Sequence, residues 1–514
     1  MMRPVYLSLT LLSVLLSACG GGGGSSSSGS ATSQTPTPTQ TPALGIEHLS
    51  AGDTTVVDNG PDAFGTRSAN LTDVDGILKF NLGNDFFENP WVAGSASTSS
   101  RDGLGGLFNN NACQDCHVRD GRGRAPNVSA TEDGTDFSSL LIRASRTLVS
   151  ADQSEQLDAL RIANVPDSSV GGQLQHESVI GVSKEASLRV SYTSETIMFN
   201  DGSSLELRKP QWHLTSEYAG SGHDFDQDTV FSARVAPPMI GLGLLELIPE
   251  ADLLLNEDVD DANQDGISGK ANRVWSIEAQ GTTIGRFGWK AGQPSLLEQG
   301  AGAFVNDMGL TSRLHLNESC LAHQADCLNT ENGNGDSVEE YDYEVSDTIL
   351  EAITFYSSHL AVPQRRNAFS DQVQQGKTLF QQASCDSCHV ARFTTGQSTD
   401  LPELSEQIIF PYTDLLLHDM GEGLADFTVD NVAASGADKV EFLATAREWR
   451  TPPLWGLGLT KTVNPEATFL HDGRARTILE AVLWHGGEAE DAKQQVLAMS
   501  AGERDALLAF LNDL

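Results

Sequence analysis

Two Cys-x-x-Cys-His motifs carry the most distinctive chemistry of this 514-residue chain, CQDCH at 113–117 and CDSCH at 385–389. Two thiols three positions apart on one helical turn can add across the two vinyl groups of a haem, and the next histidine then meets the iron. A redox-active cysteine pair would not explain a histidine after both motifs, and zinc ribbons space their cysteine pairs far more closely. The pattern predicts two covalently bound c-type haems, held by Cys113, Cys116, His117, Cys385, Cys388 and His389.

The other three of the seven cysteines have separate uses. Cys320 and Cys327 flank the segment LAHQAD, and an oxidising compartment permits a local disulfide between them. Cys19 follows an apolar run, Leu7 to Leu16, that is too short to span a bilayer and is typical of a secretory signal. The sequence ending in Leu16-Ser17-Ala18-Cys19 resembles the lipobox of bacterial lipoproteins, in which the cysteine is acylated; the alternative is a plain signal peptide with an incidental cysteine.

These features predict a signal peptide at 1–18 and a lipid-anchored, flexible Gly/Ser-rich tether at 19–45. The most apolar later segment, 236–249, contains three prolines and Glu246, so we expect it to be core and not a membrane span. The expected location is the bacterial cell envelope, facing the periplasm or the exterior. The net charge of −38 argues against nucleic-acid binding. It favours either a basic docking partner or simply a well-solvated surface.

Hydrophobic periodicity indicates the elements that position these motifs. Helical patterns occupy 346–360, 374–390, where an amphipathic helix delivers the second motif, and 476–484. Strand-like stretches, LRVSYTS and SLELRKP, lie in the motif-poor segment 130–230. The prediction is a mainly α protein of two cytochrome c-like domains, at 46–345 and 346–514, with a β-rich insertion at about 130–230.

The C-terminal part resembles a known group of enzymes. TPPLWGLGLT followed by FLHDGRARTILEAV is similar to the C-terminal domain of bacterial di-haem cytochrome c peroxidases and MauG-type enzymes. Fourteen residues past the motif histidine, the peroxidases have a methionine that ligates the electron-transfer haem, and MauG-type enzymes have a tyrosine. His471 is the motif histidine here, so the resemblance implies His485 as sixth ligand opposite His389. Met420, in LLLHDMGEG, is the alternative.

A second resemblance covers FGWKAGQPSLLEQGAGAFVNDMG at 287–309. It implies that Trp289 lies between the haems, and that Gln299 and Asp307 lie over the peroxide-binding haem. Asp307 departs from the peroxidase pattern, because it is two residues closer to the glutamine and replaces a longer glutamate. A surface aspartate and a core tryptophan are the competing interpretations.

Blocks such as GLGGLFNNNACQDCHVRDGRG, LLLHDMGEGLAD and FLHDGRA make the chain from about residue 76 onward similar to the di-haem oxidoreductase family, sometimes labelled thiol oxidoreductases. The resemblance implies reduction of hydrogen peroxide at the first haem, with electrons passed through the second from a small redox protein or a quinol-linked donor. Three alternatives stay open. They are a membrane-tethered electron-transfer cytochrome, in which His176 closes the first haem, a MauG-like oxidase of another substrate, and an accessory to iron uptake.

One further segment, DANQDGISGKAN at 261–272, has the oxygen side chains of a calcium loop at Asp261, Asn263 and Asp265, with Gly266 for the turn. Its twelfth position is Asn272 instead of a bidentate glutamate. A bound calcium and an Asx-rich surface turn both stay open.

Overall fold

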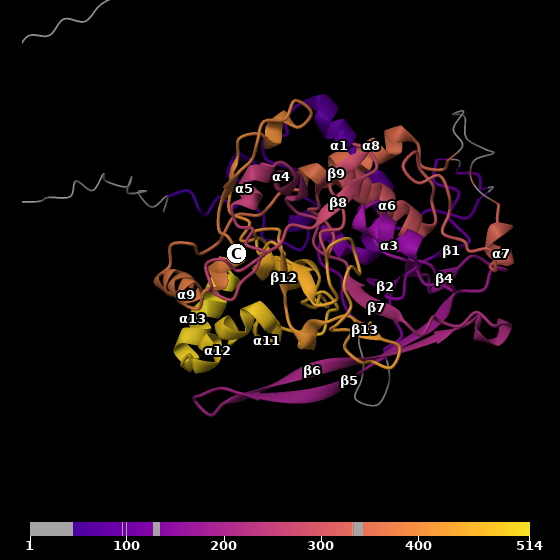
Figure 1. Cartoon of the computed structure of the whole chain (residues 1–514). Helices are drawn as coiled ribbons and strands as arrows, with labels where there is room; N and C mark the ends of the chain where they lie inside the picture. The colour runs from indigo at the N-terminus through magenta and orange to yellow at the C-terminus, as the bar shows by residue number, and fades with distance from the viewer. Residues whose placement is uncertain (1–44, 95, 99, 127–133, 332, 334–342) are drawn as a thin grey trace, which may run out of the picture. The chain divides into compact units, whose positions relative to one another are not determined.

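Strands take a larger share of this chain than its sequence patterns predict. The computed structural model describes residues 45–94, 96–98, 100–126, 134–331, 333 and 343–514 (Figure 1). The chain is 31% helical and 19% strand, with several small sheets. The expectation of a mainly α protein is therefore wrong. Most strands are only two to four residues long, and such short strands leave no period-two pattern to detect in the sequence.

Helices occur along the whole described part of the chain. They are α1 (Val74–Glu88), α2 (Cys113–Cys116), α3 (Ala151–Asp158), α4 (Leu242–Glu246), α5 (Glu250–Leu254), α6 (Leu296–Met308), α7 (Ala325–Leu328), α8 (Asp347–His359), α9 (Asp371–Gln382), α10 (Thr460–Val463), α11 (Ile478–Trp484), α12 (Glu490–Ala498) and α13 (Ala501–Leu511).

The three helices predicted from periodicity are confirmed as α8, α9 and α11. Each begins after a hydroxyl residue whose side chain accepts a hydrogen bond from the backbone N–H three positions on: Ser346, Ser370 and Thr477. Such N-caps satisfy a donor that the first helical turn leaves free. Helix α9 then packs against α13, and both lie near the C-terminus in Figure 1.

The strands are β1 (Leu107–Phe108), β2 (Leu140–Arg146), β3 (Gln173–Leu174), β4 (Glu177–Ser178), β5 (Ala186–Met198), β6 (Ser204–Ser216), β7 (Thr229–Val235), β8 (Arg273–Ser276), β9 (Gly281–Ile284), β10 (Phe393–Thr394), β11 (Ile408–Ile409), β12 (Leu417–Asp419), β13 (Phe427–Thr428) and β14 (Glu448–Arg450).

Two of these arrangements matter for the site. The predicted strands 188–194 and 204–210 are confirmed within the long antiparallel hairpin β5–β6, which runs along the lower edge of Figure 1. The largest sheet has the order β13-β7-β2-β3, and β7 is buried along its whole length. Because β13 comes from the C-terminal part of the chain, this sheet joins segments on both sides of residue 345.

Residues Gly45–Leu514 form one unit, and helices α1 and α8 pack together within it. Its largest core cluster takes side chains from early, middle and late segments, for example Phe64, Leu296 and Trp455. The division into haem domains at 345 stays a prediction. Residues 1–44, with the expected signal segment and Cys19, lie outside the described residues. Within the described ranges, no helix is long and apolar enough to cross a bilayer.

Candidate active site

The two Cys-x-x-Cys-His motifs line a single cavity of about 1150 Å³. Pockets for one small molecule usually measure roughly 300–1,000 Å³, so this one is large. The first motif forms the one-turn helix α2 and the second begins with a 3₁₀ turn at Cys385–Ser387. Although Cys113 and Cys385 are 272 positions apart in the sequence, the fold brings both motifs to the wall of one space.

Each motif histidine is held in the tautomer that a metal requires. His117 Nδ1 lies 2.7 Å from the Pro237 carbonyl oxygen, and His389 Nδ1 lies 2.9 Å from that of Tyr412. A carbonyl only accepts hydrogen bonds, so Nδ1 carries the proton and Nε2 keeps its lone pair. Burial lowers the pKa of both imidazoles to about 4, which keeps them neutral at physiological pH.

The four motif cysteines are free thiols, neither exposed nor joined in disulfides. Burial raises the pKa of Cys113 and of Cys385 to about 12. Both motifs therefore present the pair of protonated thiols that thioether formation with vinyl groups consumes.

Buried arginines on the cavity wall test whether the space suits haem. The Arg122 guanidinium donates to the carbonyl oxygens of Thr468 and Leu470, and burial lowers its pKa to about 10. Arg450 likewise donates to the carbonyls of Gly288 and Thr451, and burial lowers its pKa to about 10. Arg143 has a buried Nε with no acceptor among the described residues. Carbonyls cannot neutralise a charge, whereas the two propionates of a haem can, so the donor set fits the cofactor.

Helix α6 brings Gln299 and Asp307 to the same cavity. The helix starts after the N-cap Ser295 and stops at Gly309, whose φ of +67° is costly for residues with a side chain. Asp307 is half-buried on the cavity wall, and its Oδ1 accepts a hydrogen bond from Gln173 Nε2 at 2.8 Å. Burial raises the pKa of Asp307, while Arg143 and Gln173 oppose that rise.

Asp307 lies beside the first motif. After burial, the charge of Asp307 is the main cause of the raised pKa of Cys113 and also of Cys116. Neither thiol of the second motif has Asp307 among the causes of its raised pKa. The structure therefore places the Asp307 carboxyl group close to the two thiols of the first motif.

Sequence reasoning did not identify the side chains that hold Asp307. Gln173 Nε2 also donates to Asn109 Oδ1 at 2.6 Å, and the Asn109 amide nitrogen is 2.8 Å from His176 Nδ1. His176 sits behind Asn109 and is not among the described residues that line the cavity. Of this network, only Asp307 and His176 were predicted from the sequence, and His176 was predicted as a ligand of the first haem.

His485 and Met420 both line the cavity. His485 is the C-cap of α11, and its Nδ1 lies 2.8 Å from the Ala481 carbonyl, which leaves Nε2 with its lone pair. After burial and the Tyr412 hydrogen bond, the charge of His485 is the next influence on the pKa of His389, which it lowers. The two imidazoles are therefore close. The choice between His485 and Met420 as sixth ligand stays a prediction.

Aromatic side chains line the same cavity. Trp289 is buried, donates from Nε1 to the Val235 carbonyl at 2.8 Å, and has the Arg122 guanidinium 5.1 Å from its ring centre. His471 stacks on Trp449, with ring centres 3.6 Å apart, and its Nε2 is buried with no partner among the described residues. Trp449 was not singled out from the sequence, because nothing in its spacing marks it.

His418 is another residue that was not predicted from the sequence. It lies between two carboxylates, Asp414 at 2.8 Å from Nε2 and Glu488 at 2.7 Å from Nδ1. Burial lowers its pKa, but hydrogen bonds to Asp414 and Glu488, with the adjacent Cys388, raise it well above the ordinary value. With both ring nitrogens engaged, His418 is an imidazolium beside the second motif and not a ligand.

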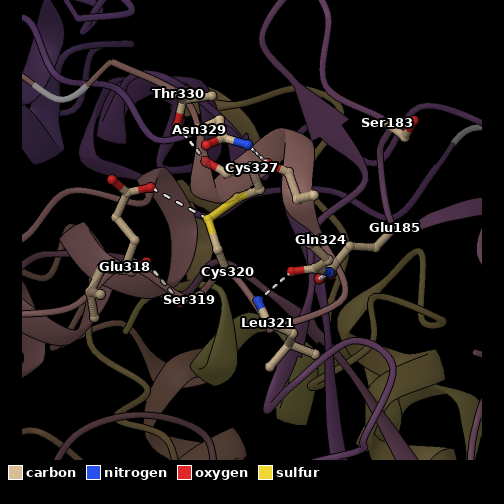
Figure 2. The surroundings of a disulfide bond; sticks show 12 residues. Ser183, Glu185, Glu318, Ser319, Cys320, Leu321, Gln324, Cys327, Asn329 and Thr330 are labelled. Atoms are coloured by element: carbon tan, nitrogen blue, oxygen red, sulfur yellow. Dashed lines mark hydrogen bonds between the residues drawn. A yellow bond between two sulfur atoms is a disulfide. The ribbon is translucent and has the colours of Figure 1, made fainter.

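Two predicted sites remain, the cysteine pair and the calcium loop, and Asp265 and Gly266 of that loop also line the cavity. Cys320 and Cys327 form a disulfide, and Gln324 between them donates to buried Glu185 at 2.7 Å (Figure 2). In the candidate calcium loop, the Asp261, Asn263 and Asp265 side chains accept hydrogen bonds from backbone N–H groups of the same turn. That is the geometry of Asx turns. Calcium binding stays a prediction.

A large cavity with two neutral histidines, four free thiols and buried arginines defines a protein built to hold two haems. In agreement, the family model described as "Di-haem oxidoreductase, putative peroxidase" matches residues 46–514. The chain belongs to this di-haem oxidoreductase family, and membership implies haem cofactors. No curated protein matches the chain significantly.

Proposed function

We propose that this oxidoreductase reduces hydrogen peroxide at a haem held by the first motif, with electrons that pass through a haem at the second. The observation that carries this proposal is the half-buried carboxyl group of Asp307 on the cavity wall beside Cys113 and Cys116. A haem that only carries electrons needs no such acid–base group. A haem that cleaves the peroxide O–O bond does.

The residues that would hold the cofactors follow from the site. Cys113 and Cys116 would attach the first haem and Cys385 and Cys388 the second, with His117 and His389 as proximal ligands. When bound, the first haem would supply the redox chemistry for the two electrons of the overall reaction, H₂O₂ + 2H⁺ + 2e⁻ → 2H₂O.

Asp307 would move the proton between the two peroxide oxygens, from the near oxygen to the leaving one. This task requires an ionised carboxylate with a proton affinity above that of an exposed aspartate, and burial raises the pKa of Asp307 in that direction. The hydrogen bond from Gln173 holds Oδ1 in place. The other carboxylate oxygen, Oδ2, would then face the substrate. Gln299, eight residues earlier on α6, would orient the peroxide.

Electrons would enter at the second motif and cross the cavity wall through Trp289 and the stacked Trp449–His471 pair. The net charge of −38 favours a donor with a basic docking surface, either a small redox protein or a quinol-linked cytochrome. The lipobox-like segment at Cys19 supports lipid attachment in the bacterial cell envelope, facing the periplasm or exterior, as part of this proposal.

One observation favours a second candidate, a MauG-like oxidase of another substrate. His485 lies close to His389, and an imidazole in place of a thioether stabilises ferric haem. The second haem would then share oxidising equivalents with the first instead of relaying electrons from a high-potential donor. The electron-carrier alternative finds less support, because its candidate ligand His176 does not line the cavity.

The test is the Asp307→Asn variant of the holoprotein, mixed with hydrogen peroxide and followed by stopped-flow absorbance. The rate should fall by roughly 10²–10⁴-fold, which is the usual contribution of general acid–base catalysis. Asp115→Asn is the matched control, since Asp115 belongs to the same motif but is exposed and does not line the cavity. A wild-type rate in Asp307→Asn with unchanged haem content would refute the assignment.

A further inference from the structure

A buried tyrosine–aspartate pair lies behind the first motif. Tyr356, on α8, has no exposed surface, and its hydroxyl donates to Asp120 Oδ1 at 2.5 Å. Asp120 follows His117 by three positions and is only 4% exposed. The mechanism proposed above uses neither residue.

Aromatic rings connect this pair to the haem site. The Tyr356 and Phe87 ring centres are 5.3 Å apart, and those of Phe87 and His117 are 6.1 Å apart. Both separations are typical of packed aromatic pairs. Phe87 and His117 both line the cavity. A single ring, that of Phe87, therefore lies between Tyr356 and His117, the proximal histidine of the proposed first haem.

The second motif has a counterpart with the same parts. The buried Tyr412 hydroxyl donates to Glu47, and the Tyr412 and Phe380 ring centres are 6.1 Å apart. Phe380 in turn lies 6.2 Å from the His389 ring. Each haem-binding histidine therefore has a phenylalanine, a buried tyrosine and a carboxylate in series.

The two carboxylates differ in their charged neighbours. Glu47 forms ion pairs with Arg365 at 2.8 Å and Lys377 at 2.6 Å, which neutralise it and lower its affinity for a proton. Among the described residues, no ion pair reaches Asp120, and the charged side chain that acts on it is Glu88, another carboxylate. Asp120 is thus a carboxylate without a cationic partner among the described residues, whereas Glu47 contacts two cations.

We propose that Tyr356 is a redox-active residue that gives one electron to the first haem after peroxide has oxidised that haem. As the electron leaves the phenol, its hydroxyl proton passes along the hydrogen bond to Asp120, and a neutral tyrosyl radical remains. The tyrosine is oxidised and the haem is reduced by one electron. An electron from the external donor and the proton from Asp120 later restore the phenol.

The hydrogen bond is what makes this step accessible. A phenol that loses an electron becomes a strong acid, so oxidation inside the protein needs a base already in contact with the hydroxyl. Burial also keeps the radical away from solvent and other molecules. The pair would hold an oxidising equivalent whenever peroxide arrives while the second haem is oxidised.

The inference rests on the proposed peroxide reaction, and the experiment separates the two. Fully oxidised holoprotein is mixed with one equivalent of hydrogen peroxide, freeze-quenched, and examined by electron paramagnetic resonance, with absorbance recorded in parallel. Wild-type protein should show a tyrosyl radical whose hyperfine pattern changes when its tyrosines carry ring deuterium. The intensity of that signal should be at least ten-fold lower in Tyr356→Phe. It should fall equally in Asp120→Asn, which keeps Tyr356 but removes the group that accepts its proton.

Tyr412→Phe is the matched control and should retain the wild-type signal. If Tyr356→Phe fails to retain haem, a fluorinated tyrosine at position 356 replaces it and should alter the hyperfine pattern. An undiminished radical in Tyr356→Phe, or an equal loss in Tyr412→Phe, would overturn the inference. An absorbance change without any tyrosyl radical would refute the inference alone, whereas no absorbance change in wild type would refute the proposed function and this inference with it.

Discussion

Backbone carbonyls set the chemistry of the cavity histidines in this protein. The Pro237 and Tyr412 carbonyls fix the tautomers of His117 and His389, so each offers Nε2 to a metal. In the same way, Nδ1 of His485 donates to the Ala481 carbonyl and Nδ1 of His471 donates to the Ala233 carbonyl. Each of these four histidines therefore has an Nε2 lone pair available for a metal. Whether it binds one depends on its position in the cavity.

The sixth ligand of the second haem can be decided by paired substitutions. We expect His485→Met to replace the low-spin spectrum of that haem with a histidine–methionine one. Its reduction potential should rise by a sizeable part of the roughly 0.8 V span that axial ligands control, because a thioether favours ferrous haem. Met420→Leu should leave both spectrum and potential unchanged. Redox titration followed by absorbance measures this, and the opposite pattern would assign Met420.

Sequence reasoning identified residues whose types and spacing are themselves distinctive. The four thiols, the two histidines and the cavity-lining Gln299, Asp307 and His485 all belong to such local patterns. It missed Gln173, Asn109, Trp449 and His418, which act through partners far away in the chain. Gln173 meets Asp307 across 134 positions, and His418 meets Glu488 across 70. A single sequence contains no signal for contacts of that length.

At the scale of elements, helices were predictable and short strands were not. The helices α8, α9 and α11 combine an apolar stripe with a Ser or Thr N-cap, and both signals are local. The pairs β10–β11 and β12–β14 hold loops around the second motif with strands of two or three residues. Tertiary packing decides which of these short strands pair. The sequence patterns therefore predicted a more helical fold class than the structure has.

Glu185, which accepts a hydrogen bond from Gln324 in the disulfide loop, gives a prediction for the pH dependence of stability. Burial raises the pKa of Glu185 from 4.5 to about 8, although it accepts hydrogen bonds from Gln175 and Gln324. Between these values the folded chain holds a proton that the unfolded chain has released. Glu185 therefore lowers stability as pH rises from about 4.5 to 8, and the loss is complete above the folded pKa.

Glu185→Gln should remove this dependence, because an amide stays neutral. Relative to wild type, its Tm should rise with pH across that window by roughly a few degrees and then level off. Differential scanning calorimetry at a series of pH values measures it. Glu217→Gln, at an exposed neighbouring glutamate, should follow wild type at every pH. A constant Tm difference between Glu185→Gln and wild type would show that Glu185 does not titrate in this range.

At the scale of the whole molecule, both Cys-x-x-Cys-His motifs line one cavity. Segments from both sides of residue 345 build its wall, and the sheet β13-β7-β2-β3 ties them together. The wall is not symmetric. A carboxyl group anchored by Gln173 lies beside the first motif, whereas His485, Met420 and the imidazolium of His418 lie on the side of the second. In the proposed function, this asymmetry would separate a haem that reacts with peroxide from a haem that exchanges electrons.

The central claim is that the first iron has an open face and the second does not. The most direct measurement adds hydrogen peroxide to half-reduced holoprotein, with electron paramagnetic resonance spectra taken before and after mixing. The account predicts one high-spin haem that reacts with a stoichiometric amount of peroxide, and one low-spin haem that then becomes oxidised. Two low-spin haems, both unreactive toward peroxide, would contradict it.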